Sequence, residues 1–249
     1  MGLFDLFASK EDRERNALRR LVKKVTEKYG PPENRQKAID QLGSMGTPAA
    51  LEALCQRFTI RADPGITDDE EKETSRRILV EAGQAAVGPL EQFLRQEETG
   101  IAWGLRCLGD ILSQERVSRV ALAELSRLSR EYSRDPEKKL TLLTWLVEHH
   151  GGVQGAEVEA ALLPLLEDFS DDVRIGALRA LAALAPGEPS REGLIQLLLR
   201  DRDNARVRGE VLDALVRMGA DVKGYRPSVE ALLVEPFYLD REGNVKKRG

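Results

Sequence analysis

Histidine and cysteine are scarce in this sequence, which has two residues of each among 249. Metal sites built from several His and Cys ligands are therefore nearly excluded, and a scaffold held by multiple disulfides is ruled out. Aromatic residues make up only 5% of the chain. No apolar run approaches the roughly 18 to 20 residues that a membrane-spanning helix needs. These scarcities favour a protein that is folded by aliphatic packing.

A strong excess of one charge is also missing, because 38 Lys and Arg stand against 42 Asp and Glu, for a net charge of -4. A protein that coats nucleic acid is expected to be basic, so this balance argues against that class. The apolar start of the chain is interrupted by Asp5 and followed by the charged residues 10–15, so we expect no secretory signal there. We expect a cytoplasmic protein that does not bind membranes.

What the chain does contain is an internal repeat of helical character. The segment Asp171–Leu181 aligns with Ala205–Leu215 at an offset of 34 residues, and both carry a Val-Arg pair before an Ala- and Leu-rich stretch. This length suits one helix, a turn, a second helix and a linker. Weaker copies lie upstream, and no alternation typical of strands is found. The pattern predicts an all-α protein of about six stacked helix pairs.

The ends of the chain differ from the repeats. An amphipathic helix ends at Gly30 and is expected to cap the first repeat, although the apolar residues Leu3, Phe4, Leu6 and Phe7 leave contact with a membrane open. We therefore predict one domain over residues 1–249. It comprises an N-terminal capping region at 1–30, helical repeats at 33–236 and a C-terminal tail at 237–249. Phe237–Leu239 either seals the last repeat or docks on another protein, and sealing is favoured.

Acidic residues mark several predicted helix starts. Thr67 and Glu70 have the spacing of a capping box, in which each side chain satisfies a free amide of the other's backbone. The acidic runs 68–71 and 171–172 are interpreted as complements of the helix dipole.

The last two copies resemble the HEAT repeat, and especially its short phycobilisome-lyase-like version, on the segment Asp172–Leu181 and again at Val207–Arg208. The resemblance implies an armadillo-like α-solenoid, a right-handed superhelix whose second helices line the concave face. It also implies that Asp172 caps the first helix. The arginines Arg174 and Arg208 would then bond to a neighbouring turn rather than to a ligand.

Signatures of catalysis are missing from the sequence. It contains no Gly-rich phosphate loop, no nucleophile elbow and no zinc-protease motif. The pair His149–His150 is interpreted as a helix end, and Cys55 and Cys107 as small buried hydrophobes. We expect no enzyme activity, no cofactor, no metal and no small-molecule substrate.

One predicted helix, Arg116–Tyr132, carries an arginine stripe opposite an apolar face that includes Tyr132. The ordinary interpretation is a solvated face, and the functional one is a binding site for an acidic partner segment through forked contacts. Trp103 lies off the apolar face of its own helix and either packs on the next repeat or anchors an interface. Trp145 is assigned to the core. The candidate protein-binding residues are Arg116, Arg119, Arg127, Arg130 and Trp103.

A solenoid offers a long exposed groove, which suits extended protein contacts better than small-molecule chemistry. The preferred hypothesis is a non-enzymatic adaptor or scaffold that binds a protein or peptide. The alternative is a DNA-binding protein similar to the HEAT-like alkylpurine DNA glycosylases, for which Trp103, Trp145 and Asp110 supply the residue types but no aligned motif. A chromophore-lyase-like activity is suggested only by the likeness of the repeats.

Overall fold

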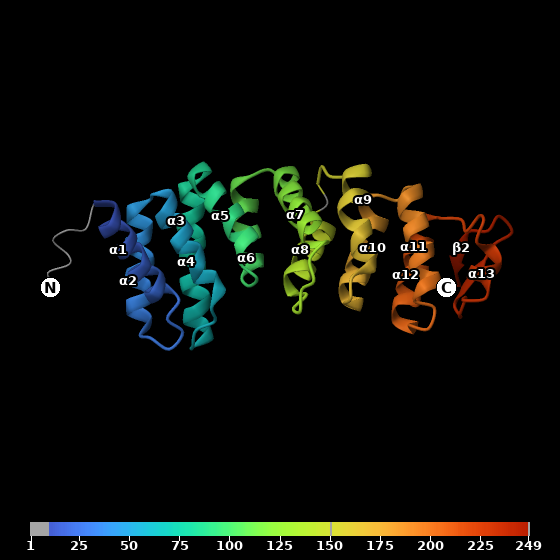
Figure 1. The fold of residues 1–249 in the computed structure, drawn as a ribbon, viewed down its shortest axis with the longest axis horizontal. Helices are drawn as coiled ribbons and strands as arrows, with labels where there is room; N and C mark the ends of the chain where they lie inside the picture. The colour runs from blue at the N-terminus through green and yellow to red at the C-terminus, as the bar shows by residue number, and fades with distance from the viewer. Residues whose placement is uncertain (1–9, 150, 249) are drawn as a thin grey trace. The chain divides into compact units, whose positions relative to one another are not determined.

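The computed structural model of the chain describes residues 10–149 and 151–248. The expectations for the apolar residues 3–7 and for His150 lie outside these ranges. The chain divides into two compact units, Met1–Ser113 and Gln114–Gly249 (Figure 1). That the two form a single domain stays a prediction.

The first unit consists of helices stacked in two layers. One layer is formed by α1, α3 and α5, and the other by α2, α4 and α6, with each helix contacting the next of its layer. Their bounds are α1 Lys10–Val25, α2 Pro32–Met45, α3 Pro48–Cys55, the 3-10 helix η2 Gln56–Thr59, α4 Gly65–Ala82, α5 Gln84–Gln96 and α6 Ile101–Ile111.

The second unit repeats this arrangement. Helices α8, α10 and α12 contact one another in turn, while α7, α9 with η3, α11 and α13 form the other layer. Their bounds are α7 Gln114–Leu128, α8 Glu137–Glu148, α9 Ala156–Leu162, η3 Leu163–Glu167, α10 Asp171–Leu184, α11 Glu188–Arg200, α12 Ala205–Met218 and α13 Arg226–Glu230, followed by strands β1 Phe237–Leu239 and β2 Val245–Lys247.

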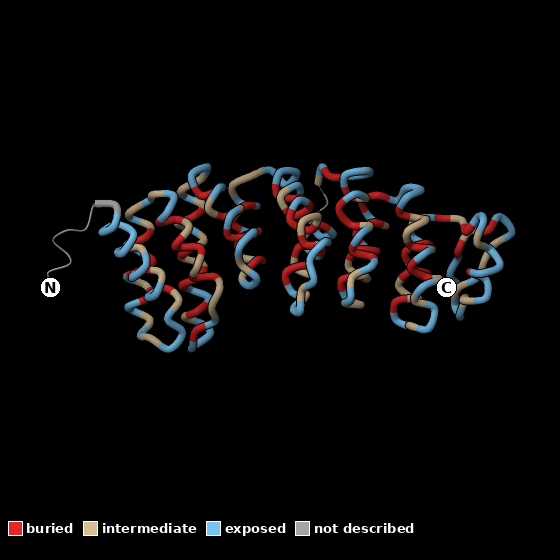
Figure 2. Tube along the Cα trace, in the orientation of Figure 1, coloured by how far each residue is buried: buried red, intermediate tan, exposed pale blue. Residues whose placement is uncertain are grey.

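Burial follows the helical period in both units, so that each helix turns its apolar stripe toward its neighbours (Figure 2). In α10 and α12 the aligned residues Leu178 and Leu212 are both fully buried. These two helices have the same length and begin 34 residues apart, at Asp171 and Ala205. The predicted all-α class, the stacking of an α-solenoid within each unit and the repeat register are confirmed.

The starts of two helices, α10 and α4, differ from the predictions. The caps of α10 and α12 are Ser170 and Asn204, whose side chains accept hydrogen bonds from the backbone N–H three residues later. Asp172 lies inside the first turn and does not cap, because the cap residue must precede the helix. Helix α4 begins at Gly65, so Thr67 is already helical and the predicted capping box is wrong.

The C-terminal tail forms a β-hairpin that the sequence analysis missed. Strands β1 and β2 pair antiparallel, with Tyr238 opposite Lys246. Val245 is fully buried, and its strand contacts α12. The backbone N–H of Val222 also donates to Gly243 O at 2.9 Å. The expected sealing of the last repeat is therefore performed by the whole hairpin, with Val245 as its buried residue.

No helix of the described ranges has the length and apolar character required to traverse a lipid bilayer.

A buried ionic network joins three elements of the first unit. Arg35 of α2 and Arg57 of η2 both donate through Nε to Glu71 Oε2 of α4, at 2.8 and 2.9 Å. Arg57 Nη2 also binds Asp68 Oδ1 at 2.6 Å, and Lys72 Nζ binds Asp68 Oδ2 at 2.8 Å. All five side chains are buried. The acids at 68 and 71, interpreted from the sequence as dipole complements, are instead partners of arginines from preceding elements.

Basic side chains link successive turns in the second unit. Lys139 Nζ of α8 donates to the carbonyl of Glu131 and contacts Asp168 Oδ2 at 2.7 Å. One repeat later, Arg174 Nη1 donates to the carbonyl of Asp168, and its Nε lies 3.0 Å from Asp201 Oδ2. That last contact is an ion pair. The predicted bond from Arg174 to a neighbouring turn is confirmed. Arg208, for which the same bond was predicted, instead donates to the carbonyl of Arg202 in the turn before its own helix.

Replacing Glu71 with Gln is expected to destabilise the chain by about 3–5 kcal/mol, because Arg35 and Arg57 then lose their shared anion while they stay buried. The loss is measured by urea unfolding followed by circular dichroism. The matched control is Glu70→Gln, which removes an exposed carboxylate from the same helix and should change stability by less than about 0.5 kcal/mol. Equal losses in the two variants would contradict the assignment.

The network also predicts a pH dependence. Burial by itself raises the pKa of Asp68, but the hydrogen bonds from Lys72, from the Ala62 N–H and from Arg57 lower it below its usual 3.8. Because the folded-state pKa is the lower one, this carboxylate stabilises the fold fully above about pH 4. The contribution is lost as the pH falls through the folded-state pKa. Urea unfolding at several pH values should show a smaller acid-induced loss in Asp68→Asn than in the unchanged protein or in Asp69→Asn.

Candidate functional site

Helix α7 ends before the last arginine of the predicted stripe. The helix runs from Gln114 to Leu128, so Arg116, Arg119 and Arg127 lie on it and Arg130 follows it. Helix residues predicted for the apolar face are buried, among them Val117 and Leu125. Tyr132, which was assigned to that face, lies beyond the helix and is 74% exposed, so this part of the prediction is wrong.

Arg127 belongs to a partly buried cluster rather than to an open surface. Its Nη2 binds Glu124 Oε1 at 2.6 Å, and its Nη1 binds Glu131 Oε1 at 2.8 Å. Lys138 Nζ of α8 contacts the same Glu124 oxygen at 3.0 Å. Burial raises the pKa of Glu124, but the hydrogen bonds from Arg127 and Lys138 outweigh it and lower the value. Glu124 therefore ties α7 to α8 through Lys138, and Arg127 is held by the same carboxylate.

Arg119 of α7 lies at the surface and pairs with two exposed carboxylates. Its side chain is 59% exposed and binds Glu115 Oε1 at 2.8 Å, with Glu157 Oε2 of α9 at 3.9 Å. Exposed pairs of this kind contribute only about 0.2–1 kcal/mol, so a stronger acidic partner can replace them. Arg116 and Arg130 are also exposed. The structure thus leaves three of the four predicted arginines at the surface.

Trp103 of α6 packs against an earlier element of the first unit. Its ring stacks on that of Phe58 in η2, with centroids 5.7 Å apart and an interplanar angle of 5°. The guanidinium of Arg106 lies 4.7 Å from the centroid of the indole ring. The packing partner is thus the preceding hairpin, whereas the sequence analysis expected the next one.

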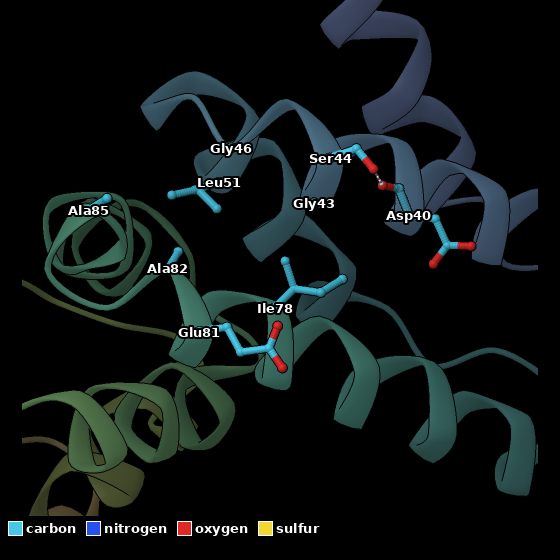
Figure 3. A pocket seen from close by; sticks show the side chains of 9 residues that line it. All are labelled: Asp40, Gly43, Ser44, Gly46, Leu51, Ile78, Glu81, Ala82 and Ala85. Carbon is cyan, nitrogen blue, oxygen red and sulfur yellow. Dashed lines mark hydrogen bonds between the residues drawn. The ribbon is translucent and has the colours of Figure 1, made fainter.

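A pocket lies between the ends of helices in the first unit (Figure 3). It has a volume of about 610 Å³ and is open to solvent. Figure 3 shows that α2 and α4 supply its acidic side chains, while Ala85 comes from α5. The lining residues are Asp40, Gly43, Ser44, Gly46, Leu51, Ile78, Glu81, Ala82 and Ala85.

The residues considered for catalysis have structural partners. Asp110 is paired with Arg76 of α4, and Cys55 and Cys107 are buried free thiols. Trp145 is half-buried rather than fully in the core, and its ring stacks on His149 at 3.8 Å between centroids. His149 follows the last residue of α8, as predicted. Within the described residues no group of three or more His, Cys, Asp or Glu has the arrangement of a metal site.

Comparison with known proteins supports the repeat assignment. Residues 158–242 match the family model of HEAT repeats. The second unit contains HEAT repeats. A crystal structure of an engineered protein is similar to the chain, with 18% identity and a TM-score of 0.44 over 91% of this chain and 69% of that one. No curated protein matches the chain.

The HEAT-repeat motif in the sequence pointed to Arg174 correctly, but it gave no signal for the pocket. That hollow depends on residues with small side chains near two turns, such as Gly43 and Ala82, which a motif search does not single out. Gly46 adopts a φ of +58° at the end of α2, where the left-handed conformation favours glycine. The glycine and proline breaks were predicted as helix ends, so their position was foreseen and the hollow beside them was not.

The buried thiols of the first unit are expected to be unreactive in the folded chain. Burial raises the pKa of Cys107 to about 12 and that of Cys55 well above its usual value, so little thiolate forms at pH 8. Ellman's reagent should react on the order of a thousandfold more slowly than with a free thiol. In urea both thiols should react at the ordinary rate. A thiol that reacts rapidly without urea would contradict the packing.

Proposed function

We propose that this chain is a non-enzymatic scaffold that binds a partner protein through the exposed arginines around α7. The observation that carries the proposal is the match of residues 158–242 to HEAT repeats, because such repeats commonly mediate contacts between proteins. The stacked hairpins of the second unit also present successive helices at the surface. A partner segment that follows several helices gains contacts from each of them.

The chemistry of α7 supports an acidic segment as the partner. Arg119 projects into solvent with only surface pairs, and Arg116 and Arg130 are exposed near the two ends of the helix. Guanidinium groups bind carboxylates through two parallel hydrogen bonds, which favours Asp- or Glu-rich segments. Arg127 is left out of the proposed surface because Glu124 and Glu131 hold it. Trp103 lies in the first unit, and its role as an interface anchor stays a prediction.

The proposal is tested with a fluorescein-labelled peptide of alternating glutamate and leucine, whose binding is followed by fluorescence anisotropy at low salt. Arg119→Gln should weaken binding about three- to tenfold, because one forked contact is lost. The matched control is Arg202→Gln, which removes an exposed arginine of the same unit, from the turn between α11 and α12.

Raising the salt concentration should weaken binding of the unchanged protein and reduce the difference between the two variants. Equal affinities for Arg119→Gln and Arg202→Gln at low salt would contradict the proposed surface. Absence of peptide binding by the unchanged protein would contradict the acidic partner.

A further inference from the structure

The pocket of the first unit combines an apolar floor with an acidic rim. Leu51 of α3 is fully buried, and Ile78 of α4 is half-buried at the base of the hollow (Figure 3). Asp40 of α2 and Glu81 of α4 are both exposed and carry the carboxylates of the rim. No lysine or arginine is among the residues that line the pocket. The pocket therefore has negatively charged side chains at its opening and apolar side chains below them.

Small side chains create this hollow. Gly43, Gly46, Ala82 and Ala85 occupy positions where a longer side chain would fill the space between the two hairpins. A Cβ atom on Gly43 would lie only 3.0 Å from the side chain of Ile78, so glycine there also permits the close approach of α2 and α4. The resulting volume of about 610 Å³ is within the range of binding pockets, about 300–1,000 Å³.

The two carboxylates of the rim have few binding partners within the chain itself. Asp40 Oδ1 accepts one hydrogen bond from the neutral side chain of Gln36, at 2.8 Å. Among the described residues Glu81 has no ion pair within 4 Å. Both carboxylates are available to a cation that enters from solvent.

We propose that this pocket binds the side chain of an arginine or lysine from a partner protein. The aliphatic part of such a side chain packs on apolar surface, here Ile78 with the buried Leu51 beneath it, while its charged end stays near the opening. There the charge meets Asp40 and Glu81, with charge-assisted hydrogen bonds as the expected contacts. Phosphate-bearing ligands such as nucleic acid are disfavoured, because the same two carboxylates repel them.

The inference rests on the proposed role in protein binding, but it concerns another surface and a partner group of the opposite charge. Binding of the glutamate-rich peptide at α7 and binding of a basic side chain at this pocket are measured separately. If one kind of binding is not found, the other can still be tested.

The test compares two capped amino acids, N-acetyl-arginine methylamide and its neutral analogue N-acetyl-citrulline methylamide. Binding is followed by NMR of the ¹³C-labelled methyl groups of Ile78 and Leu51 in the full chain. The arginine compound should shift both methyl signals saturably, and the citrulline compound should do so at least several-fold more weakly. Glu81→Gln should weaken arginine binding about fivefold, because one of two carboxylates is lost.

Two further variants keep the test decisive. Glu70→Gln removes an exposed carboxylate from the same helix away from the pocket and should leave arginine binding unchanged. Ala82→Leu should reduce binding by filling the hollow without a change of charge. Equal shifts with arginine and citrulline, absence of any shift, or equal binding by Glu81→Gln and Glu70→Gln would each overturn the proposal. If Glu81→Gln and Glu70→Gln weaken arginine binding equally, only the overall charge of the chain matters and not the pocket.

Discussion

In the second unit, buried or partly buried basic side chains join one turn to the next at two successive positions in the stack. Lys139 contacts its own turn at Glu131 and the following turn at Asp168, and Arg174 does the same with Asp168 and Asp201. Aliphatic packing supplies most of the driving force for stacking, but it is not directional. The ion pairs are directional, and removing one partner leaves a charge poorly solvated. They therefore fix the register in which one hairpin lies on the next.

The same principle operates in the first unit with different residues. There Glu71 accepts from two arginines that come from separate elements, Arg35 and Arg57, and thereby fastens α2 and η2 to α4. The buried charges are paired with one another inside each unit. Recognition of a partner therefore depends on charged groups at the surface. The proposed surfaces are of opposite sign, with arginines around α7 and carboxylates at the pocket beside Asp40 and Glu81. Each surface lies within one unit and can be tested alone.

The repeat, its length and the apolar faces of the helices were predictable, because Leu178 and Leu212 recur at equivalent positions and burial follows helical periodicity. Partners distant in sequence were not predictable. Asp68 resembles any acid near a helix start, and only the fold brings Arg57 to it. The hairpin was missed because strands of three residues carry too little alternation to be recognised. Arg119 lies at the surface, as the sequence predicted, whereas Arg127 forms an ion pair with the buried Glu124.

The central claim, that charged contacts between turns hold successive hairpins in register, is tested most directly by a double-mutant cycle on Arg174 and Asp201. Urea unfolding of Arg174→Met, Asp201→Asn and the double variant gives their coupling free energy. The account predicts a favourable coupling above about 1 kcal/mol, because these two partly buried groups are 3.0 Å apart. Additive losses in the double variant, with no coupling beyond about 0.3 kcal/mol, would contradict it.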